Sequence, residues 1–409
     1  MASYSLIRGD ALRIPLRDES VDAIVTSPPY FALRSYQDDG EHYTGQIGSE
    51  PTPADFLAAL WAVSDECYRV LKPTGSMFVD LGDKYAGPST GHKPNDGALH
   101  TIDGRATGYV RGTGANPYDV SIKSLMGLPW RYALGLSCPD TYRPDPGPQW
   151  TLRAEIVWSK PNGLPESVTD RVRRSHETWF HFTKGPRYYA AVDEIREAQK
   201  LSGGEGNDQG RLSGGGHRHR TFTSNKADYN PLGKLPGSVW TIPSEPLAVP
   251  DHIGVDHFAA FPQEWPRRLI LGWTPNGICT ACREGRRPVV AKERVHTQAT
   301  YTGSRTAAGV GNVTNTGGED WLPGRDTATI TGYACACDVT LAPTRPAVVF
   351  DPFVGTGTVV MTARALGRYG IGLDLSRDYL RLARWRISES RHGAKSINRT
   401  NRERQGELW

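Results

Sequence analysis

The sequence predicts an α/β protein built on a doubly wound, mostly parallel β-sheet. Two observations support this prediction. Apolar segments of strand length alternate with segments of helical periodicity, and a strand, a glycine turn and a helix follow one another near the C-terminus. With 409 residues, the chain is long enough for one large domain with insertions or for two domains.

The order of elements follows from the apolar pattern. Strands are expected at residues 21–25, 76–81, 153–158, 178–183, 347–350 and 370–373, and helices at 55–71, 262–272, 357–366 and 377–388. The first helix is the clearest, because its apolar residues recur at helical spacing and Lys72-Pro73-Thr74-Gly75 ends it. Residues 86–120, 201–230 and 283–334 are polar and rich in Gly, Ser, Thr or Pro, so we expect loops there.

The composition fits a folded protein of the cytosol. Hydrophobic residues make up 38% and charged residues 22%, which argues against global disorder. The net charge of +4 does not by itself indicate a nucleic-acid-binding protein, but arginines cluster at 171–174, 211–220 and 377–404. Such clusters are either solvated surface or phosphate-facing patches. Neither an apolar signal region nor a stretch that could cross a membrane is present, so we expect a cytoplasmic protein without a membrane partner.

A glycine turn follows the predicted strand at 347–350. In Asp351-Pro352-Phe353-Val354-Gly355-Thr356-Gly357-Thr358, glycines allow close approach of a ligand, and the helix that follows offers free N–H groups. Asp374 ends the next strand about 20 residues later, which suits a carboxylate that binds ribose hydroxyls. The pair indicates a nucleotide-type cofactor; the alternative is a plain turn beside a surface acid. The third glycine of the dinucleotide fingerprint and a Gly-Lys-Ser/Thr loop are absent, which argues against NAD and ATP.

A stiff arm follows the predicted strand at 21–25. In Thr26-Ser27-Pro28-Pro29-Tyr30, each residue before a proline is pushed into an extended conformation, and the prolines carry no N–H. The segment therefore holds carbonyl acceptors at fixed angles. Alone, it could equally be a stiff turn that closes a strand.

Together, TSPPY and DPFVGTGT resemble the DNA amino-methyltransferases, S-adenosylmethionine-dependent enzymes that methylate N4 of cytosine or N6 of adenine. The catalytic motif precedes the cofactor loop, as in the β-type order of that family. Further similar segments cover most of the chain: Gly9-Asp10, Leu71–Tyr85, Ser175–Lys184, Gly237–Pro243 and His257–Pro262. The last departs from the family at Phe258, where proline is usual. The resemblance implies a permuted, Rossmann-like methyltransferase fold with loop insertions.

The resemblance also implies which residues act. Ser27, Pro28, Pro29 and Tyr30 would be catalytic: the Ser27 hydroxyl and the Pro28 carbonyl would accept hydrogen bonds from the base amine, and Tyr30, or Phe31, would stack on the base. The target nucleotide would have to be flipped out of the duplex, at a cost of roughly a few kcal/mol. The implied cofactor-binding residues are Asp10, Phe261, Pro262, Asp351, Pro352, Phe353, Gly355, Gly357, Thr358 and Asp374.

The target base is predicted from one residue. In this family, Asp before Pro-Pro is typical of adenine N6 and Ser is typical of cytosine N4, so Ser27 favours N4 of cytosine. The alternatives are an N6-adenine enzyme, a methyltransferase that acts on RNA or a small molecule, and a zinc-containing nucleic-acid-binding protein without activity. The expected partner is double-stranded DNA, with a cognate restriction endonuclease as a further candidate; the sequence leaves the oligomeric state open.

Four of the six cysteines form two close pairs, Cys279/Cys282 and Cys335/Cys337. Four thiolates suit a tetrahedral zinc ion, as in zinc ribbons, and in a reducing compartment such pairs suggest metal binding before disulfides. Four unmetallated thiols and an iron–sulfur cluster are the alternatives. A zinc site here would be structural, or would form a small knuckle that contacts DNA.

The expected organisation places recognition outside the catalytic core. We expect Arg211, Arg218 and Arg220 to contact DNA, because arginine suits phosphates and base edges. The expected segments are a catalytic half at 1–195 with a loop insertion at 86–130, a recognition segment at 196–236, a return to the core at 237–275, a zinc-binding insertion at 276–340, a cofactor-binding half at 341–391 and a basic tail at 392–409.

Overall fold

The structure is a computed structural model. It describes residues 4–32, 45–87, 119–163, 165–198, 230–247, 249–250, 253, 260–295, 325–335, 337 and 342–388, and the backbone of the two-residue strands β3 (Gln37–Asp38), β4 (Glu41–His42), β6 (Thr101–Ile102) and β7 (Arg105–Ala106). The predicted DNA contacts Arg211, Arg218 and Arg220 lie outside these residues, as does Phe258. The chain divides into two compact units: Met1–Val192 with Gly237–Arg287 and Cys335–Trp409, and Asp193–Pro236 with Pro288–Ala334.

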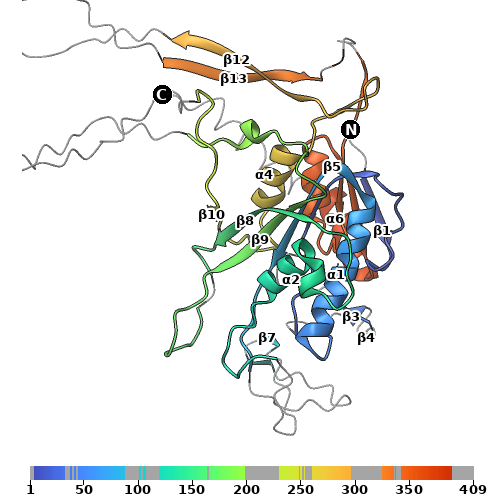
Figure 1. Cartoon of the computed structure of the whole chain (residues 1–409), viewed down its shortest axis with the longest axis vertical. Coiled ribbons are helices and arrows are strands. Elements are labelled where there is room, and N and C mark those ends of the chain that lie inside the picture. The colour runs from blue at the N-terminus through green and yellow to red at the C-terminus, as the bar shows by residue number, and fades with distance from the viewer. Residues whose placement is uncertain are drawn as a thin grey trace, which may run out of the picture. The chain divides into compact units, whose positions relative to one another are not determined.

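An eight-stranded sheet forms the centre of the first unit (Figure 1), in the order β1-β16-β15-β2-β5-β9-β8-β10. These strands are β1 (Tyr4–Arg8), β16 (Tyr369–Asp374), β15 (Val348–Asp351), β2 (Val21–Thr26), β5 (Leu71–Leu81), β9 (His176–Thr183), β8 (Thr151–Ser159) and β10 (Val239–Thr241). Every pairing is parallel except the two made by β9, which runs antiparallel to β5 and to β8. The predicted mostly parallel sheet is confirmed.

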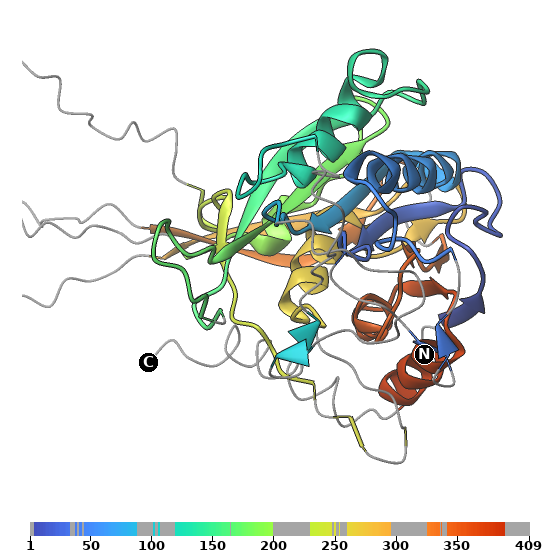
Figure 2. The same ribbon diagram turned by 90° about the horizontal axis from the view of Figure 1, so that it is seen from below.

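Helices cover both faces of this sheet, as Figure 2 shows. The helices of this unit are α1 (Pro53–Val70), α2 (Leu128–Ser137), α3 (Pro139–Tyr142), α4 (Glu264–Trp273), α5 (Thr358–Ala365) and α6 (Arg377–Ser388). Side chains that alternate along β9 enter two different cores. Phe180 packs with α1 and α2, whereas Trp179 packs with α4. Burial on both faces is what a doubly wound sheet requires.

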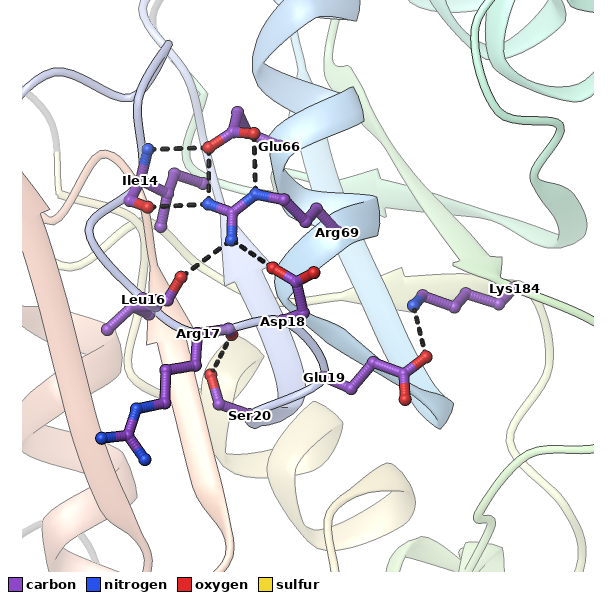
Figure 3. A network of polar contacts seen from close by, with 9 residues as sticks. All are labelled: Ile14, Leu16, Arg17, Asp18, Glu19, Ser20, Glu66, Arg69 and Lys184. Carbon is purple, nitrogen blue, oxygen red and sulfur yellow. Dashed lines mark hydrogen bonds and ion pairs between the residues drawn. The ribbon is translucent and has the colours of Figure 1, made fainter.

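The last turn of α1 fixes the connection that leads into β2 (Figure 3). The guanidinium of Arg69 donates to both carboxylate oxygens of Glu66, to Asp18 and to the carbonyl oxygens of Ile14 and Leu16, at 2.7 to 2.9 Å. A planar donor fork of this kind holds several acceptors at once. The connection is therefore anchored directly before the strand that carries the stiff arm.

The second unit contains a two-stranded antiparallel sheet that the sequence did not predict. The strands are β12 (Arg287–Val295) and β13 (Arg325–Ala334), and a 3-10 helix, η1, spans Val192–Ile195. Thr331 donates from its hydroxyl to the carbonyl oxygen of Val289. The expectation of loop across 283–334 is wrong over these two strands. No helix among the described residues is long and apolar enough to cross a membrane.

Candidate active site

The predicted site residues of the first unit gather at one edge of the sheet. Asp10 follows β1, Asp374 ends β16, Asp351 ends β15 and Ser27 follows β2. Because these four neighbouring strands are parallel, their carboxyl ends meet at the same edge, which is where ligands bind in open α/β sheets. Segments from the two ends of the chain thus form one site.

A buried hydrogen bond joins the stiff arm to the glycine turn. The hydroxyl of Thr26 donates to Oδ1 of Asp351 at 2.7 Å, and both side chains are buried. The N–H of Phe353 donates to the same oxygen at 3.1 Å. Burial raises the pKa of Asp351 to about 7, although both hydrogen bonds act in the opposite direction. The carboxyl therefore titrates close to neutral pH.

The hydroxyl of Tyr30 contacts ionisable groups that the sequence did not predict as part of the site. This hydroxyl lies 3.3 Å from Oδ2 of Asp80 and 3.2 Å from Oε2 of Glu177. Nζ of Lys160 pairs with Oε1 of Glu177 at 2.6 Å and lies 4.0 Å from the ring centroid of Trp158. We name Tyr30, Asp80, Glu177 and Lys160 the tyrosine cluster.

Burial favours the protonated forms of two side chains in the tyrosine cluster, Asp80 and Tyr30. Burial, with the charge of Glu177, raises the pKa of Asp80 well above its usual range, and burial also raises the pKa of Tyr30. Oδ1 of Asp80 has no hydrogen-bond partner among the described residues. The positive charge of Lys160 acts in the opposite direction and partly offsets this rise in the pKa of Asp80. The arrangement holds a buried carboxyl with a raised pKa and a half-buried phenol beside the stiff arm.

The position of Tyr30 depends on Gly82. A Cβ at Gly82 would lie 2.5 Å from Cε2 of the tyrosine ring, so only glycine leaves room for the ring. Phe31, the other aromatic residue considered for base stacking, is buried and packs on Phe56 with ring centroids 5.4 Å apart. Phe31 belongs to the core, and Tyr30 is the aromatic side chain that remains half-buried at the arm.

The glycine turn is shaped by two left-handed residues. Gly355 and Gly357 have φ values of 47° and 79°. The N–H of Gly355 donates to Oδ2 of Asp374 at 2.9 Å, and a Cβ on Gly355 would meet nothing closer than 3.8 Å. The turn therefore presents an open side, where a ligand can approach the backbone. Asp10 is exposed. It lies beside Asp374, because the N–H of its neighbour Gly9 donates to the carbonyl oxygen of Asp374.

Thr358 is buried and begins α5 directly after this turn. Its hydroxyl lies 2.6 Å from a guanidinium nitrogen of Arg386, which also donates to the hydroxyl of Thr356 at 2.8 Å. Burial lowers the pKa of Arg386 to about 10, which leaves it charged at neutral pH. Arg386 was missed in the sequence because it lies in an arginine-rich helix. Its hydrogen bonds to Thr356 and Thr358 join α6 to the glycine turn and to the start of α5.

The other predicted residues occupy two further places. Phe261 and Pro262 lead into α4, and the ring of Phe261 meets that of Trp179 edge-on at 5.6 Å. The four predicted cysteine ligands lie together, with their sulfur atoms all within 4.8 Å of one another: Cys279, Cys282, Cys335 and Cys337. The structure thus brings the pair Cys279/Cys282 next to the pair Cys335/Cys337, which lies far from it in the sequence.

Comparisons with known proteins place these features in one family. A family model described as DNA methylase (N6_N4_Mtase) matches residues 21–279 and 342–384. The chain belongs to this DNA methylase family. The methylase is 35% identical over 275 residues to the Type II methyltransferase M.Cfr9I of Citrobacter freundii, covering 67% of this chain and 73% of that one. It is 28% identical over 394 residues to M.SmaI of Serratia marcescens, covering 96% and 93%.

One solved structure shares the fold. The PvuII DNA methyltransferase (cytosine-N4-specific) matches with a TM-score of 0.50 at 15% identity, and the match covers 100% of this chain and 94% of that chain. The family match identifies this methylase as an S-adenosylmethionine-dependent Type II DNA amino-methyltransferase. The site fits that cofactor, because its open glycine turn is flanked by carboxylates that suit ribose hydroxyls and cationic groups.

Proposed function

We propose that this methylase transfers the methyl group to N4 of cytosine in a nucleotide flipped out of duplex DNA. The observation that carries the proposal is Ser27, which stands before Pro28-Pro29 at the carboxyl end of β2. A serine there offers a neutral hydroxyl to the base amine. The carbonyl oxygen of Pro28 is a second acceptor, held by the stiff arm. N6 of adenine is the alternative target.

The cofactor supplies an electrophilic methyl group on its sulfonium when it is bound. Asp374 is proposed to accept from the ribose hydroxyls, since a carboxylate that receives Gly355 and Ser376 N–H groups retains further acceptor sites. Asp10 is proposed to contact the adenine. Asp351, Pro352, Phe353, Gly355, Gly357, Thr358, Phe261 and Pro262 are proposed to line the remaining parts of the cofactor site.

The residues of the arm act by orienting the amine. The amine nitrogen is a poor nucleophile because its lone pair is delocalised into the ring. Hydrogen bonds to the Ser27 hydroxyl and the Pro28 carbonyl would favour a tetrahedral nitrogen, whose lone pair would form the new N–C bond as the S–C bond breaks. The methylated nitrogen would then release one of its protons to solvent. Tyr30 is proposed to stack on the flipped base, which offsets part of the cost of unstacking. Proximity supplies much of the rate enhancement, and no covalent enzyme intermediate is required.

The test is nucleoside mass spectrometry of unmethylated DNA that has been incubated with the protein and S-adenosylmethionine. We expect N4-methylcytosine, reduced at least about a hundredfold by Ser27→Ala and Pro28→Ala. Ser121→Ala, at an exposed serine outside the site, is the matched control and should leave the yield unchanged. N6-methyladenine alone would overturn the choice of base. Methylation of RNA only, or cofactor binding without any transfer, would overturn the proposed activity. In vivo, a cognate restriction endonuclease is the proposed partner.

A further inference from the structure

The four cysteines Cys279, Cys282, Cys335 and Cys337, which we name the four-cysteine cluster, converge on one point. The sulfur atoms of Cys279 and Cys337 are 3.8 Å apart, those of Cys335 and Cys337 are 3.3 Å apart, and all four lie within 4.8 Å of one another. Zn–S bonds of about 2.3 Å in a tetrahedron place the sulfurs about 3.8 Å apart. The cluster has the size of a single-ion site.

The first pair stands on a turn that is already shaped to hold a metal. Cys279 ends β11 (Ile278–Cys279); its N–H donates to the carbonyl oxygen of Glu284, and the N–H of Arg283 donates back to the Cys279 carbonyl, both at 2.9 Å. Arg283 has a φ of 64°, the left-handed conformation that tightens this turn.

The second pair is held beside the first by β14 (Thr344–Arg345). This strand pairs antiparallel with β11, and Cys279 lies opposite Thr344. The N–H of Thr280 donates to the carbonyl oxygen of Pro343 at 3.0 Å, and Arg286 donates to that of Ala342 at 2.6 Å. These bonds fix the returning chain next to the turn independently of any sulfur contact. The convergence of the thiols is therefore built into the backbone.

Disulfides, an iron–sulfur cluster and bare thiols fit this geometry less well than a single metal ion. The sulfur–sulfur distances of 3.8 Å from Cys279 to Cys337 and 3.3 Å from Cys335 to Cys337 are much longer than a disulfide bond of about 2.05 Å. An iron–sulfur cluster also uses four thiolates, but it places several iron and sulfide atoms between them and needs a wider cage than 4.8 Å. Four thiols left without a metal would be joined only by weak hydrogen bonds between sulfur atoms, such as those between Cys279 and Cys337 and between Cys335 and Cys337.

We propose that the four-cysteine cluster binds one structural Zn²⁺ ion. Binding releases the thiol protons, and all four tetrahedral positions are filled by protein sulfur, so no position stays open for a substrate. The ion joins the segment of Cys279 and Cys282 to the segment of Cys335 and Cys337. Its role is separate from the transfer of the methyl group.

The experiment uses the full chain purified without chelators. Elemental analysis should find about one zinc ion per chain, and Co²⁺ exchange should give the intense thiolate-to-cobalt absorption of a tetrahedral tetrathiolate site. A thiol reagent should label Cys138, the exposed cysteine, and should reach the four-cysteine cluster only after chelation. Cys282→Ser and Cys337→Ser should lose most of the zinc. Cys138→Ser is the matched control and should keep it.

The outcomes separate zinc, iron–sulfur and metal-free states of the four thiols. Chain without zinc or iron that gives no cobalt spectrum, with the four thiols labelled at once, would overturn the proposal. Stoichiometric iron and sulfide would replace it with an iron–sulfur cluster. Because the metal and thiol measurements are made on the unmodified chain, they decide the matter even if a cysteine variant does not fold. S-adenosylmethionine binding, measured alongside, reports on the proposed active site separately.

Discussion

The hydroxyl of Thr26 donates a 2.7 Å hydrogen bond to Oδ1 of Asp351, although 325 positions separate the two residues. One residue precedes the proposed catalytic arm and the other opens the glycine turn. The bond runs between neighbouring parallel strands, β2 and β15. It therefore sets the spacing between the groups that are proposed to bind the base and the groups that are proposed to bind the cofactor.

Thr26→Val should remove the hydrogen bond that joins the stiff arm to the glycine turn. The variant keeps the shape of the side chain but leaves Oδ1 of Asp351 with the Phe353 N–H as its donor. We expect a loss of about 1–3 kcal/mol in the free energy of unfolding and weaker S-adenosylmethionine binding. Denaturant unfolding and calorimetric titration measure these quantities. Thr26→Ser retains the hydroxyl and should stay close to the wild type; equal losses in both variants would contradict this account.

Asp351 should make stability depend on pH. Its pKa rises from 3.8 in the unfolded chain to about 7 in the fold. Between pH 3.8 and about pH 7 the native state therefore keeps a proton on Asp351 that the unfolded state has lost. The contribution of this proton to the free energy of unfolding falls as the pH rises from about 4 to about 7. The slope is at most about 1.4 kcal/mol per pH unit. Asp351→Asn should remove that component when the free energies of unfolding of variant and wild type are compared across this range. Parallel curves would show that Asp351 does not titrate there.

His181 should make the stability of the protein depend on pH in the opposite direction. It is buried, its Nε2 lies 3.0 Å from the Ser76 hydroxyl, and burial lowers its pKa to about 3. Because the unfolded state takes up a proton near pH 6.5, this contribution to stability is present above that pH and is lost as the pH falls toward 3. His181→Gln should lose less stability than the wild type on acidification. Unfolding curves at pH 7 and pH 5 measure the difference.

Lys160→Met should disturb the tyrosine cluster without affecting the cofactor site. Glu177 would lose its partner beside Tyr30 and Asp80, and an unpaired, partly buried carboxylate is expected to cost about 1–3 kcal/mol of stability. We expect a lower kcat with an unchanged Kd for S-adenosylmethionine. Adding Glu177→Gln removes the uncompensated charge and should restore part of the rate. A double variant slower than Lys160→Met would rule out a charge effect.

Gly82→Ala tests the position of the Tyr30 ring. The added methyl would lie 2.5 Å from that ring, so the ring must move, and we expect a drop in kcat of about tenfold or more. Gly87→Ala is the matched control, because a Cβ there meets nothing within 4 Å. Near-ultraviolet circular dichroism checks that both variants fold. Equal rates for the two variants would show that the ring position does not matter for transfer.

Much of this fold follows from the sequence, because its central strands are buried on both faces. The predicted strand at 21–25 is found at Val21–Thr26, and the predicted helix at 377–388 is found at Arg377–Ser388. The sheet of β12 and β13 was missed because the stretch 283–334 as a whole is polar and rich in Gly and Thr, although β13 itself alternates polar and apolar residues, as in Thr329-Ile330-Thr331. Helix α2 begins at Leu128, inside the stretch expected to be a loop insertion.

The site residues also fall into those that the sequence could predict and those that it could not. Ser27, Asp351 and Asp374 stand in local motifs, so their positions at one sheet edge could be predicted. The tyrosine cluster could not, because its members come from β5, from β9, from the arm and from the residue that follows β8. The antiparallel register of β9 decides which of these side chains meet. That register places Asp80 opposite Trp179 and Trp158 opposite Glu177. No local sequence pattern encodes such a pairing.

The position of β2 between β15 and β5 also governs how the protein is made. A ribosome delivers β2 and β5 early, whereas β15 and β16 are synthesised near the end of the chain. Until then β2, which is buried along its whole length in the finished protein, has an open edge that can pair with other chains. We expect the complete site to form only after β15 has been synthesised and has paired with β2, and protection of the open edge of β2 before then to limit aggregation.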